Sequence, residues 1–380
     1  MKLRLCSKPR TDSFALIVAL LAIFVLSCNA ALLWYSMQVD MKLAAQSQEE
    51  PQLLWMGRSG VELARYVLAQ SANIPGEPYD SLNQLWAGGP GGLGESNSVL
   101  NSISLDHYQI GDGWVSLKII DLERYANINT VTPQLLNQAL TTMGVDANDL
   151  PTVSDSIMDW IQPGDNPRLS GAKNQYYLSL DPPYYCKEAP MDDISELLLV
   201  KGVTPAMYNG GTEMAGTLSS VAKKLGLTGN GGQTVTYPFG LKDVFTPFSD
   251  GKININTADA NVLQLIPGVD ETTAEAIIKT RGGPSGGNGP DATPFTGTGD
   301  VQRAGINPEA MQNIGAYCDV RSHTFQVTVT VHYGNLTRQY VAVIWRNQPN
   351  DIRTVGFYWA HPPPPPPPSA SDDQNNATSQ

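Results

Sequence analysis

The stretch that decides the fold is residues 13–39, SFALIVALLAIFVLSCNAALLWYSMQV, which are 27 consecutive residues without a charged side chain. A helix of that length, at 1.5 Å per residue, is roughly 40 Å long, enough to cross a bilayer core of about 30 Å. Four basic residues, Lys2, Arg4, Lys8 and Arg10, precede it. Since lysine and arginine favour the cytoplasmic side, the sequence predicts a single-pass anchor with a cytoplasmic N-terminus and the remaining body outside.

A cleaved signal peptide or a lipoprotein signal is the alternative interpretation of this segment. Val25-Leu26-Ser27-Cys28 is similar to a lipoprotein box. However, residues 30–35 remain apolar after it, and the whole run is long for a signal peptide. We therefore favour a membrane anchor that is uncleaved or is cleaved close to its N-terminus.

The charge of the body bears on its partners. The formal net charge of the 380 residues is −12. The four basic residues against Asp12 give residues 1–12 a charge of +3, which leaves −15 for the rest of the chain. Because nonspecific nucleic-acid binding needs lysine and arginine to neutralise phosphates, an acidic body argues against it.

Only two cysteines belong to the body, Cys186 and Cys318, because Cys6 precedes the apolar run and Cys28 lies within it. An oxidising compartment would permit a disulfide between them. Two separate buried thiols are the alternative, and the sequence does not decide between the two.

Strand signals occur at both ends of the body. Residues 114–122 are rich in aromatic and β-branched side chains, and residues 325–333 alternate between apolar and polar. Gly334-Asn335 then indicates a turn into a second strand over 340–345. Between the first strand and this hairpin the pattern is mostly helical, so the sequence predicts an α+β fold whose small sheet is interrupted by a large insertion.

A short sequence repeat lies within the insertion. Asn127-Ile128-Asn129-Thr130 and Asn254-Ile255-Asn256-Thr257 each precede a leucine-containing segment with a helical pattern. Threonine is a favourable N-cap, so we expect a helix to begin after each Thr and the two modules to be related. Earlier in the chain, residues 41–69 should extend the membrane helix outward, with a bend or an interruption at Pro51.

Residues 265–278, LIPGVDETTAEAII, resemble a helix-hairpin-helix, and residues 199–203 form a weaker second example. In nucleic-acid binders such a hairpin presents backbone N–H groups to phosphate. Here Asp270 occupies the second glycine position, and Glu271 and Glu275 follow. Negative charge at that position favours a structural or protein-docking use.

Catalytic motifs are missing from the sequence, and the four histidines, His107, His323, His332 and His361, are scattered. Residues 159–167 and 181–185 are rich in side-chain and backbone oxygens, which calcium prefers. Turns that satisfy their own backbone explain the same composition more simply. We expect no enzyme and no cofactor, with calcium as the alternative.

The order of several motifs resembles one family, the minor pseudopilin K of type II secretion systems. Asp159-Trp160-Ile161 is followed by Pro167 and Gly171-Ala172, then by residues 176–184, YYLSLDPPY. Pro190, residues 195–204, SELLLVKGVT, and residues 253–258, ININTA, complete the series. The resemblance extends over nearly the whole chain as far as Arg346.

The resemblance implies a pilin-like fold with a long N-terminal helix on a small antiparallel sheet and an α-helical domain inserted between strands. The expected segments are a basic leader (1–13), the transmembrane helix (14–39), a pilin-like helix, loop and strand (40–123), the inserted domain (124–320), a β-hairpin (321–347) and a proline-rich disordered tail (348–380). Seven consecutive prolines, 362–368, predict polyproline II within that tail.

The family also implies function and partners. It implies a non-enzymatic subunit of the inner membrane that caps the pseudopilus with minor pseudopilins I and J and helps to export folded proteins. The major pseudopilin, the exported protein and prepilin peptidase are further implied partners. Pilins usually carry an acidic residue at the fifth mature position, which this family lacks, and Val18 stands there when Phe14 is counted as the first.

Three features depart from the family pattern. Ser13 stands where the peptidase normally cleaves after glycine, so we expect processing between Ser13 and Phe14 only if serine is accepted. Lys173-Asn174 replace a usual acidic pair, which weakens an inherited calcium site. The polar tail after His361 is additional. A membrane-anchored helix-hairpin-helix protein that binds DNA for uptake is the alternative function.

Overall fold

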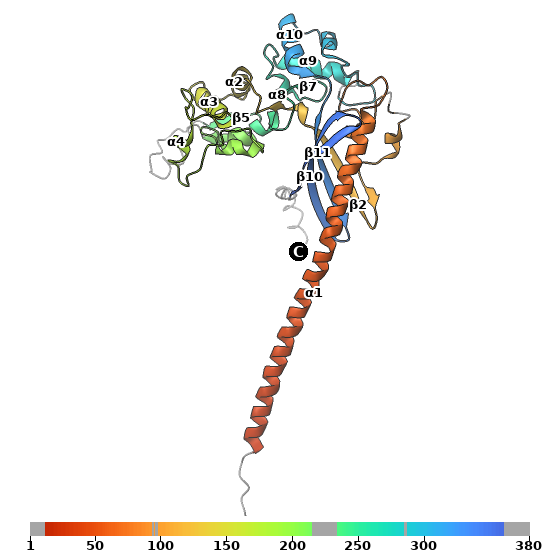
Figure 1. Cartoon of the computed structure of the whole chain (residues 1–380), viewed down its shortest axis with the longest axis vertical. Coiled ribbons are helices and arrows are strands. Elements are labelled where there is room, and N and C mark those ends of the chain that lie inside the picture. Colours follow the sequence, from red (N-terminus) through yellow and green to blue (C-terminus); the bar gives the residue numbers. More distant parts are fainter. Residues whose placement is uncertain (1–11, 93–94, 96–97, 215–233, 285–286, 361–380) are drawn as a thin grey trace, which may run out of the picture.

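The computed structural model describes residues 12–92, 95, 98–214, 234–284 and 287–360. The basic N-terminal residues up to Thr11 and the proline run therefore lie outside the described residues. Helix α1 (Asp12–Ser71, 60 residues) dominates the structure, and its N-terminal half extends away from the body (Figure 1). Leu16–Leu43 of α1 is long and apolar enough to span a membrane, and none of it is buried against the protein. The predicted apolar helix is therefore confirmed.

Helix α1 continues through Pro51, so the predicted interruption there is wrong, and the alternative of a bend stays a prediction. A proline removes one intrahelical hydrogen bond and crowds the preceding turn. Here the side chain of Pro51 is exposed, while Leu53 and Met56 immediately after it are buried in the body. The packing of the following turns against the sheet holds the helix together across this position.

The body contains a five-stranded antiparallel sheet in the order β1-β2-β9-β10-β11. Strand β2 (Gly113–Asp121) and the hairpin of β9 (Thr324–Tyr333) and β10 (Leu336–Gln348) occupy the segments in which the alternation predicts strands. Leu117 pairs with Val329, and Val329 pairs with Tyr340. All three side chains point toward α1 and form the core of the body.

Two edge strands were missed by the sequence analysis. Strand β1 (Tyr108–Ile110) pairs with β2, and β11 (Asp351–Ala360) pairs with β10. The prediction of a disordered tail from residue 348 is therefore wrong as far as residue 360. Strand β11 lies at a sheet edge, where Val355, Tyr358 and Trp359 stay largely exposed, so its sequence lacks the alternation of a half-buried strand.

Two glycines of α1 allow the helix to lie close to the sheet. A Cβ atom at Gly57 would be 2.5 Å from the ring of Tyr340, and one at Gly60 would be 2.5 Å from Val329 Cγ1. On either side of the two glycines along α1, Leu53, Ala64 and Leu68 are fully buried. The glycines thus set the distance between α1 and the sheet.

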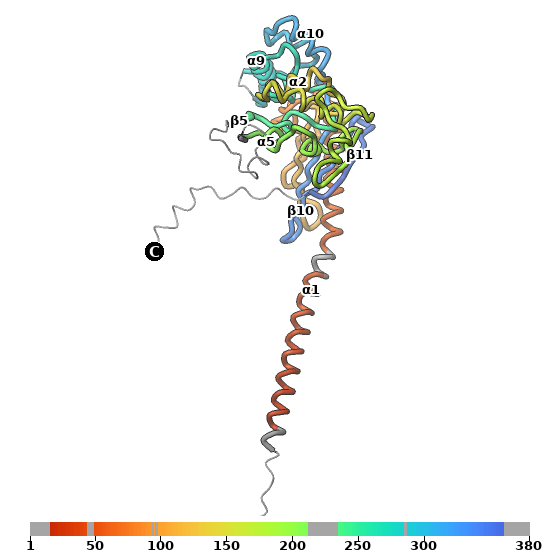
Figure 2. The backbone as a smooth tube through the Cα atoms, turned by 90° about the vertical axis from the view of Figure 1, so that its left-hand side faces the viewer, coloured from red at the N-terminus to blue at the C-terminus, as the bar shows by residue number. Residues whose placement is uncertain are grey.

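The segment between β2 and β9 is the predicted insertion, and it has a hydrophobic core of its own. Its longer helices are α2 (Pro133–Thr142), α3 (Leu150–Ile161), α9 (Glu271–Gly282) and α10 (Pro308–Tyr317). Figure 1 shows its later part, with α9 and α10, at the end of the body opposite the membrane-spanning part of α1, and its first part, with α2 and α3, to one side. Figure 2 shows this first part in front of the sheet.

Shorter elements connect these helices. They are α4 (Asn174–Tyr177), α5 (Pro205–Asn209), α7 (Leu241–Val244) and α8 (Ala260–Leu263). Three two-stranded sheets complete the insertion: β3 (Ala126–Asn127) with β6 (Phe245–Thr246), β4 (Gly211–Met214) with β5 (Thr234–Tyr237), and β7 (Ile253–Asn254) with β8 (Cys318–Asp319). The regular structure of the insertion is mainly helical, as predicted, but these ladders were not foreseen.

Candidate functional site

A buried polar cluster joins the insertion to the sheet. We call Asp80, Asp121, Glu123, Asn254, Thr257, Ser322 and Arg346 the junction cluster, and each of them is less than 5% exposed. Its members come from the loop after α1, the end of β2 and the turn just after it, strand β7 and the turn that follows it, the segment before β9, and strand β10. The cluster therefore lies where the chain leaves the sheet and where it returns.

Arg346 is the only cation of the junction cluster. Its Nη2 atom is 2.5 Å from Asp80 Oδ2 and donates to the carbonyl oxygen of Ser322 at 2.8 Å. Its Nη1 atom donates to the carbonyl oxygen of Leu68 in α1 at 3.2 Å. One side chain of β10 thus links α1, the loop after it and the segment before β9.

Asp121 is surrounded by donors. Its Oδ2 atom accepts hydrogen bonds from Asn254 Nδ2 (3.1 Å), Thr257 Oγ1 (2.5 Å) and Ser322 Oγ (2.6 Å). Complete burial raises the pKa of Asp121 to about 6, although the hydroxyl donors oppose that change. Because Asn254 and Thr257 belong to the insertion, Asp121 connects the insertion to the end of β2.

Glu123 lies beside Asp121 in the junction cluster and binds the backbone at the start of β9. Its two carboxyl oxygens accept the backbone N–H groups of His323 (2.6 Å) and Thr324 (3.0 Å), where the chain enters β9. Burial raises its pKa to about 9, and the charges of Asp121 and Asp250 add to the effect. These contacts support a structural function, because the carboxylates are used to hold backbone rather than to face a cavity.

The two Asn-Ile-Asn-Thr segments form the same local structure. The side chain of the first Asn accepts the N–H group two residues later: Asn127 with Asn129 (2.8 Å), and Asn254 with Asn256 (2.9 Å). Each segment also pairs in parallel with a second strand, β3 with β6 and β7 with β8. The short sequence repeat therefore corresponds to a structural repeat.

The second Asn of each repeat fixes a distant loop through a pair of hydrogen bonds. Asn129 donates to the carbonyl oxygen of Met191 at 3.0 Å and accepts its N–H at 2.7 Å. Asn256 does the same with Phe295, at 2.9 Å in both directions. The two modules thus share a device for anchoring a loop.

The predicted helix starts of the repeats are wrong by two residues. Thr132 and Asp259, rather than Thr130 and Thr257, are the N-cap residues of α2 and α8. The turn closed by the first Asn uses the intervening residues: the N–H group of Thr130 donates to the carbonyl of Asn127, and that of Thr257 to the carbonyl of Asn254. The helix begins only after this turn.

The helix-hairpin-helix comprises α8, a turn at Gly268 and α9. Gly268 has φ of +81°, and Asp270 caps α9 by accepting the N–H group of Thr273 at 2.8 Å. These contacts lower the pKa of the Asp270 carboxyl. A Cβ atom at Gly268 would lie 3.4 Å from the backbone of Ala310, and Asn313 donates to the carbonyl of Pro267. The turn therefore packs against α10, which favours the structural use.

The structure places the cysteines and histidines as follows. Cys186 and Cys318 are both free and buried, so no bridge joins them in the structure, and a bridge in the oxidised protein stays a prediction.

His107 and His332 are brought together on either side of the Trp114 ring, with centroid distances of 4.2 and 3.7 Å. No spacing in the sequence indicates this stack.

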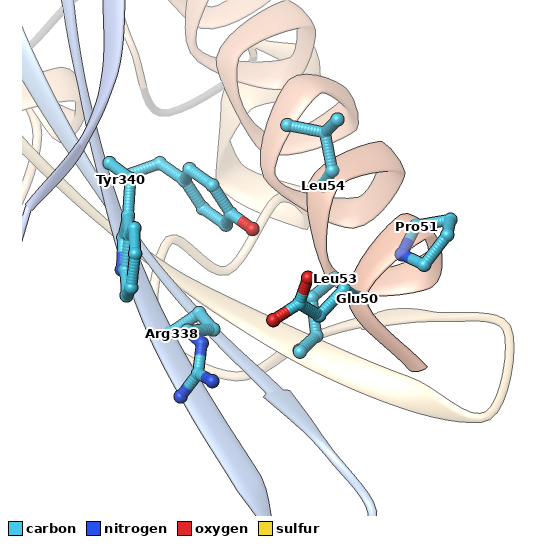
Figure 3. Close-up of a pocket in the computed structure, with 7 residues that line it drawn as sticks. Glu50, Pro51, Leu53, Leu54, Arg338 and Tyr340 are labelled. Carbon is cyan, nitrogen blue, oxygen red and sulfur yellow. The ribbon is translucent and has the colours of Figure 1, made fainter. Parts of the chain in front are cut away.

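A groove of about 410 Å³ lies between α1 and the β10–β11 edge of the sheet (Figure 3). Glu50 and Leu53 line it on the helix side, and Arg338, Tyr340 and Trp359 line it on the sheet side. The guanidinium of Arg338 lies over the ring of Trp359 at 5.5 Å. The groove is open and faces the part of α1 nearest the membrane span.

Comparisons with known proteins agree with this architecture. Residues 112–211 match the family model of type II secretion system protein K, and residues 249–284 match the model of a helix-hairpin-helix motif. The type II secretion system protein K of Pseudomonas aeruginosa is 24% identical over 285 residues, which cover 71% of this chain and 72% of the relative.

Two further matches with relatives are shorter. The protein K of Klebsiella pneumoniae is 24% identical over 27% of this chain, and the putative protein K of Escherichia coli K12 is 31% identical over 20% of it. These alignments span 35% and 23% of the lengths of those relatives.

A solved structure shows the same fold. It is described as the GspK-GspI-GspJ complex of the type 2 secretion system from enterotoxigenic Escherichia coli. The match has a TM-score of 0.58 with 18% identity and covers 84% of this chain and 99% of the other. The family model, the relatives and this fold all show similarity of the chain to type II secretion system protein K.

Proposed function

We propose that the protein is a minor pseudopilin that caps the pseudopilus of a type II secretion system, where it helps to export folded proteins. It acts as a structural subunit and not as an enzyme. The observation that carries the proposal is the continuity of α1, which runs from an exposed apolar span into the core of a five-stranded sheet. Such a helix serves as a membrane anchor before assembly and as a packing element in a fibre.

The position of the insertion supports placement at the tip. Pilin fibres pack their N-terminal helices at close, repeated spacing, and the insertion adds bulk both at the end of the body opposite the span and to one side of the sheet (Figure 1). Nothing lies above a subunit at the tip, so the bulk is tolerated only there. Val18 adds a second argument: an acidic side chain in an apolar helix needs a partner, and a first subunit has no neighbour above it to supply one.

Two minor pseudopilins, I and J, are the proposed partners, because the solved structure of similar fold is a complex of three such proteins. The insertion and the exposed part of α1 provide the docking surface. Affinity capture of the full chain from membranes of its native cell, followed by identification of bound proteins and nucleic acid, tests this assignment. We expect pseudopilins to be recovered. Capture of DNA without pseudopilins would contradict the assignment of pseudopilins as the partners.

We further propose an inner-membrane location with the N-terminus in the cytoplasm and the body in the periplasm. Prepilin peptidase would then remove residues 1–13 by cleavage between Ser13 and Phe14. N-terminal sequencing of the mature protein is the test, and the variant Ser13→Gly should be processed more completely. A lipidated mature start at Cys28 would contradict the anchor.

DNA uptake is the second candidate because of the helix-hairpin-helix match. The acidic body and the capping carboxylate of Asp270 oppose it. Filter binding at low salt is the severe test, since low salt favours electrostatic association. We expect no retention of DNA, and micromolar affinity under those conditions would favour this candidate.

A further inference from the structure

The oxygen-rich loop after α3 contains a lysine ammonium at its centre. Lys173 is only 4% exposed. Its Nζ atom donates to the carbonyl oxygens of Asp159 at 2.7 Å and Gln162 at 2.6 Å. Both carbonyls belong to the C-terminal end of α3, where the helix dipole favours a positive charge. A cation is therefore built into the position at which the backbone oxygens converge.

The carboxylates nearby are already used by the loop. Asp159 Oδ2 accepts the backbone N–H of Arg168 at 3.0 Å, and Asp155 Oδ2 accepts that of Ser170 at 3.1 Å. A Cβ atom at Gly171 would lie 2.0 Å from Asp159 Oδ2, so the chain passes directly against this carboxylate. These carboxylate oxygens therefore hold the backbone of the loop.

Asn174, the next residue, hydrogen-bonds the second part of the loop. Asn174 donates to Glu188 Oε1 at 3.0 Å and accepts the backbone N–H of Cys186 at 2.8 Å. The side-chain amide of Asn174 thus donates to one carboxylate and accepts from one backbone N–H group. Lys173 and Asn174 between them connect the end of α3 to residues 186–188 without any added ligand.

Calcium does not fit this donor set. It requires six to eight oxygens, whereas here two carbonyls face an ammonium and the carboxylates face N–H groups. In the part of the chain that the structure describes, no three His, Cys, Asp or Glu side chains are placed to hold a metal. We propose that the Lys173 ammonium takes the place of a bound divalent cation, so that the insertion folds and remains stable without calcium.

Thermal unfolding of the full chain in neutral detergent tests the proposal. The wild-type protein should show the same Tm, within about 1 °C, in excess calcium chloride and in excess chelator, because RT ln(1 + [L]/Kd) vanishes for a ligand that does not bind. Lys173→Met removes the ammonium donor from both buried carbonyls and should lower the Tm by roughly 5–10 °C. Calcium chloride should not restore it.

Lys279→Met is the matched control, because Lys279 is exposed on α9, and its Tm should stay within about 1 °C of wild type. Terbium titration gives an independent measurement on the wild type, with Trp160 of α3 beside the loop as the sensitiser. The proposal is overturned if chelator lowers the wild-type Tm by several degrees, if terbium binds stoichiometrically, or if Lys173→Met matches Lys279→Met. Each result leaves the pseudopilin assignment intact.

Discussion

Replacement of Arg346 by methionine should be among the most damaging single changes to the body. It leaves the Asp80 carboxylate, 2% exposed, without its cation, removes the guanidinium donor from the carbonyl of Ser322, and removes one of two donors from the carbonyl of Leu68. Removal of one partner from a buried ion pair costs about 3–5 kcal/mol. The exposed pair of Arg353 with Asp351 provides the control, since such pairs contribute about 0.2–1 kcal/mol.

Urea unfolding of the full chain in detergent, followed by tryptophan fluorescence, measures both variants. Arg346→Met should lower the free energy of unfolding by about 3–5 kcal/mol and Arg353→Met by less than about 1 kcal/mol. The double variant Asp80→Asn/Arg346→Met should recover part of the loss, because the buried charge is then removed on both sides. Equal effects of the two arginine variants would refute the assignment of the junction cluster as the link between sheet and insertion.

Three further predictions concern pH, packing and capping. The pKa values of Asp121 and Glu123 are raised from 3.8 and 4.5 to about 6 and about 9, so the folded state binds more protons and its stability should fall as pH rises through these windows. Glu123→Gln should flatten the decline between pH 6 and 9, and an unchanged Tm profile would contradict this. Gly60→Ala should cost about 1–3 kcal/mol in urea unfolding through overlap with Val329, whereas Gly315→Ala, which has open space, should be neutral or stabilising. Asp270→Ala should lose about 1 kcal/mol with its N-cap and should gain no DNA affinity in filter binding.

Local patterns in the sequence were sufficient for the elements with strong periodicity. The uncharged run of residues 13–39 predicts the apolar helix, and the alternation over 325–333 predicts β9 because one face of that strand is buried against α1. The repeated Asn-Ile-Asn-Thr segments predict a structural repeat because each Asn acts within two residues of itself. These signals are local, so a single sequence contains them.

The remaining features depend on partners far apart in the chain. Arg346 and Asp80 are separated by 266 positions, and Thr257 and Asp121 by 136, so no spacing rule indicates the junction cluster. Strand β11 obtains its order from pairing with β10 at a sheet edge, which leaves its side chains without alternation. The position of Lys173 follows from the return of the loop onto α3 and was visible in the sequence only as an unexpected basic residue.

The stoichiometry of assembly tests the central claim most directly. The purified full chain is mixed in detergent with pseudopilins I and J of the same secretion system, and the mixture is examined by size-exclusion chromatography with light scattering. The cap model predicts one discrete complex with one copy of each protein. Assembly of this protein alone into long filaments, with no complex formed by the mixture, would contradict it.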